Sequence, residues 1–231
     1  IIDGGETPTG APWLVMDLVE GRPIDAWCRD QALDRNARLA LLAEAADILG
    51  AAHARLVIHG DLKVDHVLVN SRGELRLLDF GIAQALDEQG LGRAAEGFSP
   101  DYASPEQAVG KRLSTASDIF QLGRIAAQVM EPVGGDAALR AVIARATASD
   151  PADRYASIAG FAADMRAIIA DDPVTALPDT RGRALMRLVR RNRLAAALGL
   201  LLVAGSAGWA VTATRSASAI AHERNAALRA A

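Results

Sequence analysis

The chain has 231 residues, of which 51% are hydrophobic and 23% are charged. This length allows one domain with its own core, plus additional segments. A single cysteine excludes an internal disulfide and a metal site built from several cysteines. The formal net charge of −3 is divided unevenly, because residues 1–180 carry −11 and residues 181–231 carry +8.

The first half of the chain predicts both strands and a long helix. Residues 11–21, "APWLVMDLVEG", are typical of a buried strand that ends in a turn at Gly21. Apolar residues recur at helical spacing from 34 to 56, which predicts an amphipathic helix. Further on, "HVLVN" and "LRLLD" predict two short strands joined by the turn "SRGE".

The second half is predominantly helical. Residues 82–104 form a polar, glycine-containing stretch without a period, which predicts a loop. From residue 105 onward the sequence predicts helices in "PEQAVG", "SDIFQLGRIAAQVM", "AALRAVIARATA" and "YASIAGFAADMRAIIA". We expect the domain to end at residue 170 and a linker with a basic segment to occupy 171–193.

An uncharged segment follows at 194–214, "LAAALGLLLVAGSAGWAVTAT". A helix of this length spans about 30 Å, so we expect a single transmembrane helix, with a buried Ala-rich core helix as the alternative. A secretory signal peptide is excluded because the segment lies near the C-terminal end. Six arginines precede the segment: Arg181, Arg183, Arg187, Arg190, Arg191 and Arg193.

These arginines predict the orientation of the membrane helix. By the positive-inside rule the large N-terminal part is cytoplasmic, and residues 215–231 begin an extracytoplasmic region. The arginines could also bind nucleic acid, but beside an apolar segment we expect them to contact anionic lipid, with no nucleic-acid partner. Ala204 and Gly208 have the small-xxx-small spacing of helix dimers, so a homodimer is compatible with the sequence.

The segment 59–81 contains the candidate chemistry. Asp61 and Lys63 lie in "HGDLKVDHVLV", on a loop that leads into a strand, and Asp79 ends the next strand before Phe80 and Gly81. An acid at a strand end can bind Mg²⁺, which takes oxygen ligands and shares them with phosphates. A second acid can accept a hydroxyl proton, and a lysine can neutralise phosphoryl charge. For any single aspartate, a solvated surface charge is the alternative.

Five motifs occur in a fixed order: "HGDLKVDHVLV", "LLDFG", "YASPEQ", "SDIFQLGRI" and "DPADRY". Together they resemble the C-terminal lobe of bacterial Hanks-type Ser/Thr protein kinases of the receptor-like kind. The resemblance implies an α+β, protein-kinase-like fold with a mainly helical C-lobe at 20–170 and remnant N-lobe strands at 1–19. It also implies ATP and Mg²⁺ as cofactors and protein Ser/Thr hydroxyls as substrates.

The resemblance implies a role for each matched residue. Asp61 matches the catalytic acid, Lys63 the lysine that contacts the γ-phosphate, and Asp79 the Mg²⁺ ligand. Residues that match the adenine site are Asp17, Leu18, Val19 and Leu68. Four further positions match structural or specificity roles: Ser99 in the substrate loop, Glu106 and Arg154 in a salt bridge, and Asp118 bracing the catalytic loop.

Three residues depart from the family pattern. His66 stands where the family has a metal-binding asparagine, and an imidazole is poorly matched to Mg²⁺. Either the substitution is tolerated with weaker metal binding, or phosphoryl transfer is lost. Gly60 replaces the arginine that pairs with a phosphorylated activation loop, which predicts control without such pairing. Val64 replaces a proline, a minor change.

The largest departure is the small N-lobe. No lysine precedes Lys63, although the family holds the α- and β-phosphates with a lysine on an earlier strand. "IIDGGETPTG" resembles the hairpin between the fourth and fifth strands of that lobe. We therefore interpret the chain as a fragment of a longer kinase that is inactive by itself, with natural degeneration as the alternative.

The predicted function is a single-pass Ser/Thr protein kinase of the inner (cytoplasmic) membrane that acts in signal transduction. One alternative is a membrane-anchored pseudokinase that serves as a docking module, which Gly60, His66 and the missing N-lobe favour. Another is a small-molecule phosphotransferase of the aminoglycoside-kinase kind, which shares "HGDL". The motifs "YASPEQ" and "SDIFQLG" argue against it, because they belong to a peptide-binding lobe.

Overall fold

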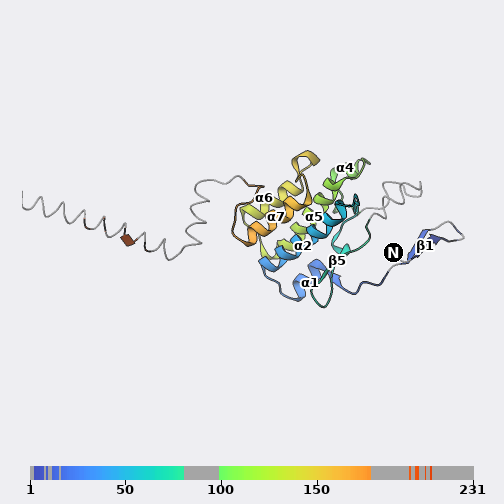
Figure 1. Cartoon of the computed structure of the whole chain (residues 1–231), viewed down its shortest axis with the longest axis horizontal. Helices are drawn as coiled ribbons and strands as arrows, with labels where there is room; N and C mark the ends of the chain where they lie inside the picture. Colours follow the sequence, from blue (N-terminus) through green and yellow to red (C-terminus); the bar gives the residue numbers. More distant parts are fainter. Residues whose placement is uncertain are drawn as a thin grey trace, which may run out of the picture. The chain divides into compact units, whose positions relative to one another are not determined.

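The computed structural model describes residues 3–7, 9, 12–15, 17–80 and 99–177, and only five positions beyond them, 198, 201, 202, 206 and 209. The chain forms two compact units, Ile1–Pro178 and Asp179–Ala231. In the first unit, helices α2, α5, α6 and α7 lie side by side, as Figure 1 shows.

The N-terminal strands form an antiparallel hairpin. Strand β1, Asp3–Glu6, pairs with β2, Pro12–Val15, with Asp3 opposite Val15. The expected strand at 11–21 is thus confirmed only over its first part, and the expectation that it is buried is wrong. Trp13 and Val15 are 40% and 43% exposed, because β1 is the only strand that pairs with β2 within the described residues.

A second antiparallel sheet carries the segment with the candidate chemistry. Its order is β3 (Arg22–Pro23), β4 (Val67–Val69), β5 (Leu75–Leu77). The predicted pair β4–β5 is confirmed, and its connecting turn is closed by Asn70, whose side chain accepts hydrogen bonds from the backbones of Arg72 and Glu74. Strand β3 was not predicted, because two residues carry no period.

The helical core is built around α2, Arg35–His53. Asp34 caps its first turn by accepting a hydrogen bond from Ala37 N at 2.8 Å. Its face of Leu39, Leu42 and Leu49 is fully buried and contributes to one core with α7. The helix predicted for residues 34–56 is therefore confirmed within a few residues.

The remaining helices follow the predicted order. They are α1 (Ile24–Asp30), α4 (Pro105–Ala108), α5 (Thr115–Met130), α6 (Ala137–Ala146) and α7 (Ile158–Ile169), with single 3₁₀ turns at Val64–His66, Glu131–Val133 and Pro151–Asp153. Helix α5 buries its stripe of Ile119, Leu122, Ile125 and Val129 at the centre of the unit. This helix also carries polar residues into the interior, and these position the candidate site.

The domain extends beyond the boundary that we expected at residue 170. Asp164 on α7 accepts hydrogen bonds from Thr175 N at 2.7 Å and Ala176 N at 3.0 Å, and Val174 is buried in the core. The first part of the predicted linker is therefore packed against α7. The prolines of this segment predict a linker, but hydrogen bonds to Asp164 hold its first residues against the domain.

The predicted transmembrane segment, 194–214, lies almost entirely outside the described residues. Its five described positions are helical and exposed. Within the part of the chain that the structure describes, no helix combines the length and apolar character needed to cross a bilayer. The basic segment 181–193 and the tail 215–231 also lie outside the described residues.

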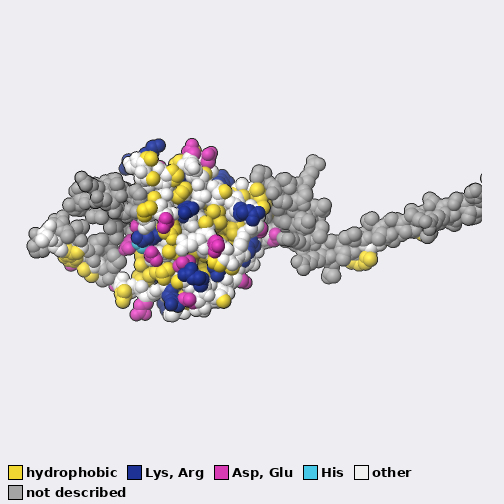
Figure 2. Space-filling model, turned by 180° about the vertical axis from the view of Figure 1, so that it is seen from behind, with side chains coloured by type: hydrophobic (Ala, Val, Ile, Leu, Met, Phe, Trp, Pro, Cys, Tyr) yellow, Lys and Arg dark blue, Asp and Glu magenta, His cyan; other side chains and the backbone are white. Residues whose placement is uncertain are grey.

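Charged side chains of both signs are interspersed over the face of the helical body seen in Figure 2. Several form exposed ion pairs, such as Arg35 with Asp136 at 2.9 Å. Such pairs are worth about 0–1 kcal/mol each. The face seen in Figure 2 therefore shows no large patch of side chains with the same charge.

Candidate active site

The loop 59–66 is held from behind by one buried carboxylate. Asp118, fully buried on α5, accepts hydrogen bonds from His59 N at 2.9 Å and Gly60 N at 2.8 Å. His53, at the end of α2, adds a third contact of 2.7 Å from Nε2 to Asp118. The bracing role expected for Asp118 is confirmed, because one side chain satisfies two consecutive amides of this loop.

Two glutamines complete this support. Gln121 on α5 accepts a hydrogen bond from Leu62 N at 2.9 Å and donates one to the Gly60 carbonyl at 3.0 Å. Gln107 on α4 donates to the same carbonyl at 2.6 Å. Both side chains are buried. Sequence reasoning missed them, although a glutamine on the apolar stripe of α5 was a signal of an internal polar contact.

Gly60 adopts a conformation that suits glycine. Its φ is +79°, and a Cβ at this position would lie 2.7 Å from Leu113 Cδ1. A larger residue would be strained in this left-handed conformation, and the end of the Leu113 side chain would have to shift to make room for it. Glycine at this position therefore suits the backbone of the loop.

Asp61 and Lys63 lie on the open side of the loop. Lys63 Nζ is 3.6 Å from Asp61 Oδ2, and the two side chains are 26% and 17% exposed. The other carboxylate oxygen, Asp61 Oδ1, accepts a hydrogen bond from Ser99 N at 3.2 Å. The structure thus brings together an oriented carboxylate, a cation and the start of the segment 99–104.

His66 connects Asp61 to Asp79. Its Nδ1 is 2.8 Å from the Asp61 carbonyl oxygen, and its Nε2 is 3.6 Å from Asp79 Oδ2. Asp79 follows β5 with a φ of +59°, a left-handed conformation that aspartate tolerates better than most residues. Asp61, Lys63, His66 and Asp79 therefore form one cluster, which we call the acidic loop cluster.

His59 separates this cluster from the core. Its Nε2 donates to the Leu78 carbonyl at 2.7 Å, while Nδ1 has no hydrogen-bond partner among the described residues. Burial lowers the pKa of His59, although the Asp118 carboxylate opposes this effect. The ring packs against His66 with centroids 5.7 Å apart and against Phe80 at 4.9 Å. His59, itself fixed by the Leu78 carbonyl, therefore packs against the His66 ring.

Of the residues expected at the adenine site, Leu68 lies near the end of the segment that contains the other three. Asp17, Leu18 and Val19 lie in a segment without regular structure between β2 and β3, and Leu18 is 88% exposed. Leu68 on β4 lies opposite Pro23 and contacts Gly21, where an added Cβ would lie 3.1 Å from Leu68 Cβ. Leu68 is thus close to the end of this segment, while Leu18 points into solvent.

The expected salt bridge between Glu106 and Arg154 is confirmed. Two hydrogen bonds of 2.7 Å join the side chains, and both residues are buried. Burial would raise the pKa of Glu106, but hydrogen bonds from Arg154 and from Ser117 Oγ lower it to about 2. This pair anchors α4, and with it Gln107, to the C-terminal helices.

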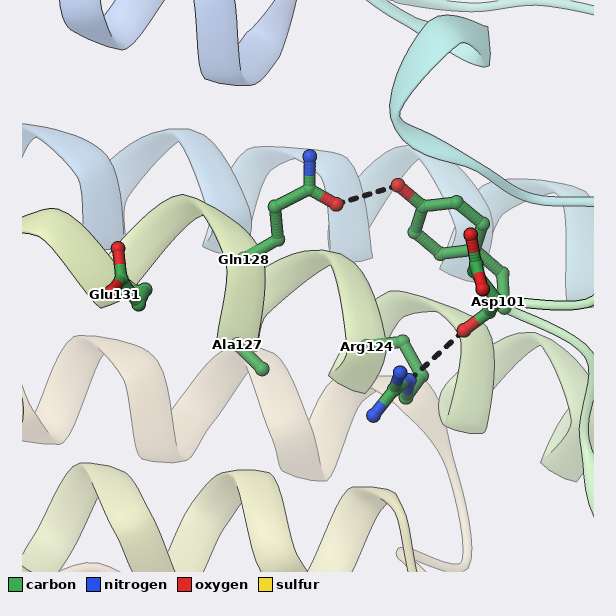
Figure 3. A pocket seen from close by; sticks show the side chains of 6 residues that line it. Asp101, Arg124, Ala127, Gln128 and Glu131 are labelled. Atoms are coloured by element: carbon green, nitrogen blue, oxygen red, sulfur yellow. Dashed lines mark hydrogen bonds between the residues drawn. The ribbon is translucent and has the colours of Figure 1, made fainter.

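A pocket of about 340 Å³ lies beside the segment 99–104. Figure 3 shows side chains from α5 on one side and Asp101 on the other, with Arg124 Nε donating to the Asp101 carbonyl at 3.1 Å. Tyr102 also lines the pocket and donates a hydrogen bond of 2.6 Å to Gln128. The pocket lining includes none of the acidic loop cluster, but Asp101 in its lining lies two residues after Ser99, whose N donates to Asp61.

Comparisons with known proteins identify the family of the chain. The model of the family described as protein kinase domain matches residues 7–135. Serine/threonine-protein kinase Pkn1 of Myxococcus xanthus is 32% identical over 225 residues, which cover 82% of this chain and 32% of that protein. Serine/threonine-protein kinase PknA of Mycobacterium tuberculosis is 34% identical over 137 residues, which cover 55% of this chain and 31% of that protein.

The chain spans about a third of the length of these two relatives. The family match alone covers more than half of the chain, and it includes every residue of the acidic loop cluster. The chain therefore belongs to the protein kinase domain family, in which its named relatives are serine/threonine-protein kinases.

Proposed function

We propose that the chain is the C-lobe part of a protein kinase that transfers the γ-phosphoryl group of ATP to serine or threonine hydroxyls of proteins. The proposal is carried by two contacts of the Asp61 carboxylate. Ser99 N donates a hydrogen bond to Oδ1, and Lys63 Nζ lies 3.6 Å from Oδ2. A carboxylate held this way can accept the proton of an attacking hydroxyl. The lysine can neutralise negative charge on the phosphoryl group during transfer.

The protein substrate would approach along the segment 99–104. Its backbone contacts Asp61 at one end, and the pocket around Tyr102 and Arg124 lies at the other. A hydroxyl presented from this segment would lie close to the Asp61 carboxylate. Proximity of this kind supplies much of the rate enhancement in phosphoryl transfer, since little covalent chemistry is left to the protein.

The residues fit a family Mg²⁺ site only in part. Asp79 offers the hard oxygen ligand that Mg²⁺ prefers, but His66 offers nitrogen where an oxygen ligand is expected. Within the described ranges, no group of three histidine, cysteine or acidic side chains could hold a metal by itself. We therefore base the proposed function on the chain's own acid and lysine.

The pseudokinase alternative is less well supported. Gly60 is accommodated by the loop, and the catalytic acid and lysine are both present. The relatives compared above are also named as kinases.

The decisive experiment measures phosphate transfer. In the full polypeptide encoded by the gene, we expect labelled phosphate from γ-labelled ATP on serine or threonine of a protein substrate. Asp61→Asn should lower the rate by about 10²–10⁴-fold, the usual contribution of a general base. Asp47→Asn makes the same chemical change at an exposed ion pair on α2 and should leave the rate unchanged. Equal rates for Asp61→Asn and wild type would exclude the assigned role of Asp61.

We also propose that residues 194–214 anchor the protein in the cytoplasmic membrane, with the arginines of 181–193 on the cytoplasmic side against anionic lipid. The support is the length and apolar character of the segment. A chain ending at residue 178 should remain in the supernatant after alkaline washing of membranes, while the 231-residue chain should sediment. Identical distribution of the two chains would argue against the anchor.

A further inference from the structure

The His66 ring has a fixed direction. Its backbone is tied on both sides, since His66 N donates to the Lys63 carbonyl at 3.0 Å and Leu78 N donates to the His66 carbonyl at 2.9 Å. The second bond also positions the residue immediately before Asp79. The ring itself packs on the buried His59 and is 13% exposed. The imidazole and the backbone that leads into Asp79 are therefore held by the same short stretch of structure.

The hydrogen bond at Nδ1 determines which nitrogen is available. The Asp61 carbonyl oxygen can only accept, so His66 Nδ1 must carry the proton at the 2.8 Å contact. In the neutral imidazole, Nε2 then bears a lone pair. That lone pair lies 3.6 Å from Asp79 Oδ2, which is also an acceptor. At this distance, beyond a direct hydrogen bond, a positive charge joins the two groups, either a proton on Nε2 or a cation between them.

This arrangement is typical of a histidine that binds a metal. Metal-binding histidines usually donate their other ring N–H to a carboxylate or a backbone carbonyl, which fixes the tautomer and the ring direction. His66 already makes this second contact to the Asp61 carbonyl. Its ligand set of one nitrogen and one carboxylate oxygen suits first-row transition metals better than Mg²⁺. Phosphate oxygens and water would complete the coordination sphere.

We propose that His66 and Asp79 bind a transition-metal dication, with nucleotide phosphate, in place of the family's Mg²⁺. The inference rests on the proposed kinase function, because the nucleotide supplies the remaining ligands. His66 is then a metal ligand that changes the metal preference, and its presence does not require loss of the site.

The test uses Mn²⁺ as the probe, together with the β,γ-methylene analogue of ATP and the full polypeptide encoded by the gene. Pulsed electron paramagnetic resonance detects the nuclear coupling of a nitrogen bound directly to Mn²⁺. We expect a histidine ¹⁴N coupling that is lost in His66→Asn, and a ratio of Mn²⁺ to Mg²⁺ affinity that falls about tenfold. His222→Asn makes the same change in the tail and should retain the coupling.

Labelling wild-type protein with ¹⁵N-histidine gives the same answer without a substitution, so the test survives if His66→Asn fails to fold. The coupling should change to that of ¹⁵N. If Mn²⁺ and the analogue bind but no histidine coupling appears, or if it persists in His66→Asn, this inference is wrong while the proposed function stands. If neither Mn²⁺ nor Mg²⁺ binds with the analogue, both the inference and the nucleotide site are wrong.

Discussion

The two sides of the loop 59–66 differ in how their polar groups are satisfied. On the buried side, Asp118, Gln121 and Gln107 make contacts of 2.6–3.0 Å to the loop backbone. On the open side, the contacts of Lys63 with Asp61 and of His66 with Asp79 are both 3.6 Å. The buried side fixes the loop, so the charged groups of the open side remain available to a ligand.

The same difference appears in the energetics. A buried polar group without a partner costs about 1–3 kcal/mol, and a buried unpaired charge costs more. An exposed ion pair contributes about 0–1 kcal/mol. Substitutions behind the loop should therefore act mainly on stability, and substitutions in front of it mainly on ligand binding. Three predictions test how far the buried polar contacts control stability.

Removing the buried cation should have the largest effect. Arg154→Met leaves the Glu106 carboxylate buried without its ion pair, and we expect a loss of about 3–5 kcal/mol in the free energy of unfolding. Urea denaturation of the chain measures it. The control is Arg166→Met, which breaks an exposed pair with Asp47 and should cost at most about 1 kcal/mol. Similar losses in the two variants would contradict the comparison.

Acid should weaken the same ion pair by a smaller amount, because protonated Glu106 is neutral but can still accept a hydrogen bond from Arg154 through its carbonyl oxygen. The pKa of Glu106 is lowered from 4.5 to about 2 in the folded state. Its stabilising contribution is therefore complete above pH 4.5 and is lost as the pH falls from 4.5 towards 2. Urea titrations across this range should show a steeper acid loss for wild type than for Glu106→Gln. If the stability of the two proteins falls in parallel with pH, Glu106 does not cause the acid loss of stability.

The smallest of the three effects concerns the glutamine support. Gln121→Leu removes the acceptor of Leu62 N and one donor to the Gly60 carbonyl, with an expected cost of about 1–3 kcal/mol. Hydrogen exchange at Leu62 N should also become faster. Gln128→Leu makes the same change on an exposed part of α5 and should leave that exchange rate unchanged. Unchanged exchange in Gln121→Leu would show that other contacts hold the loop.

Much of the fold could be predicted from local pattern. The hydrophobic period of α2 and α5 and the turn between β4 and β5 identified these elements because each depends on residues close in sequence. Burial of β2 and the boundary at residue 170 were predicted wrongly. Burial of a strand and the end of a domain both depend on which other elements pack against the segment. The residues after 170 are held to the domain by Asp164 on α7, which accepts a hydrogen bond from Thr175 N.

The sequence by itself determined which residues could perform the chemistry, since Asp61, Lys63 and Asp79 occur in motifs whose order is specific. Only the tertiary structure decided how they are held. Asp118 and Gln121 lie 57 and 59 residues from Asp61 and Leu62, and the pattern of one helix does not say which loop its polar side chains will meet. The orientation of the His66 ring was decided in the same way, because it depends on a carbonyl group that only the folded loop places within 2.8 Å of Nδ1.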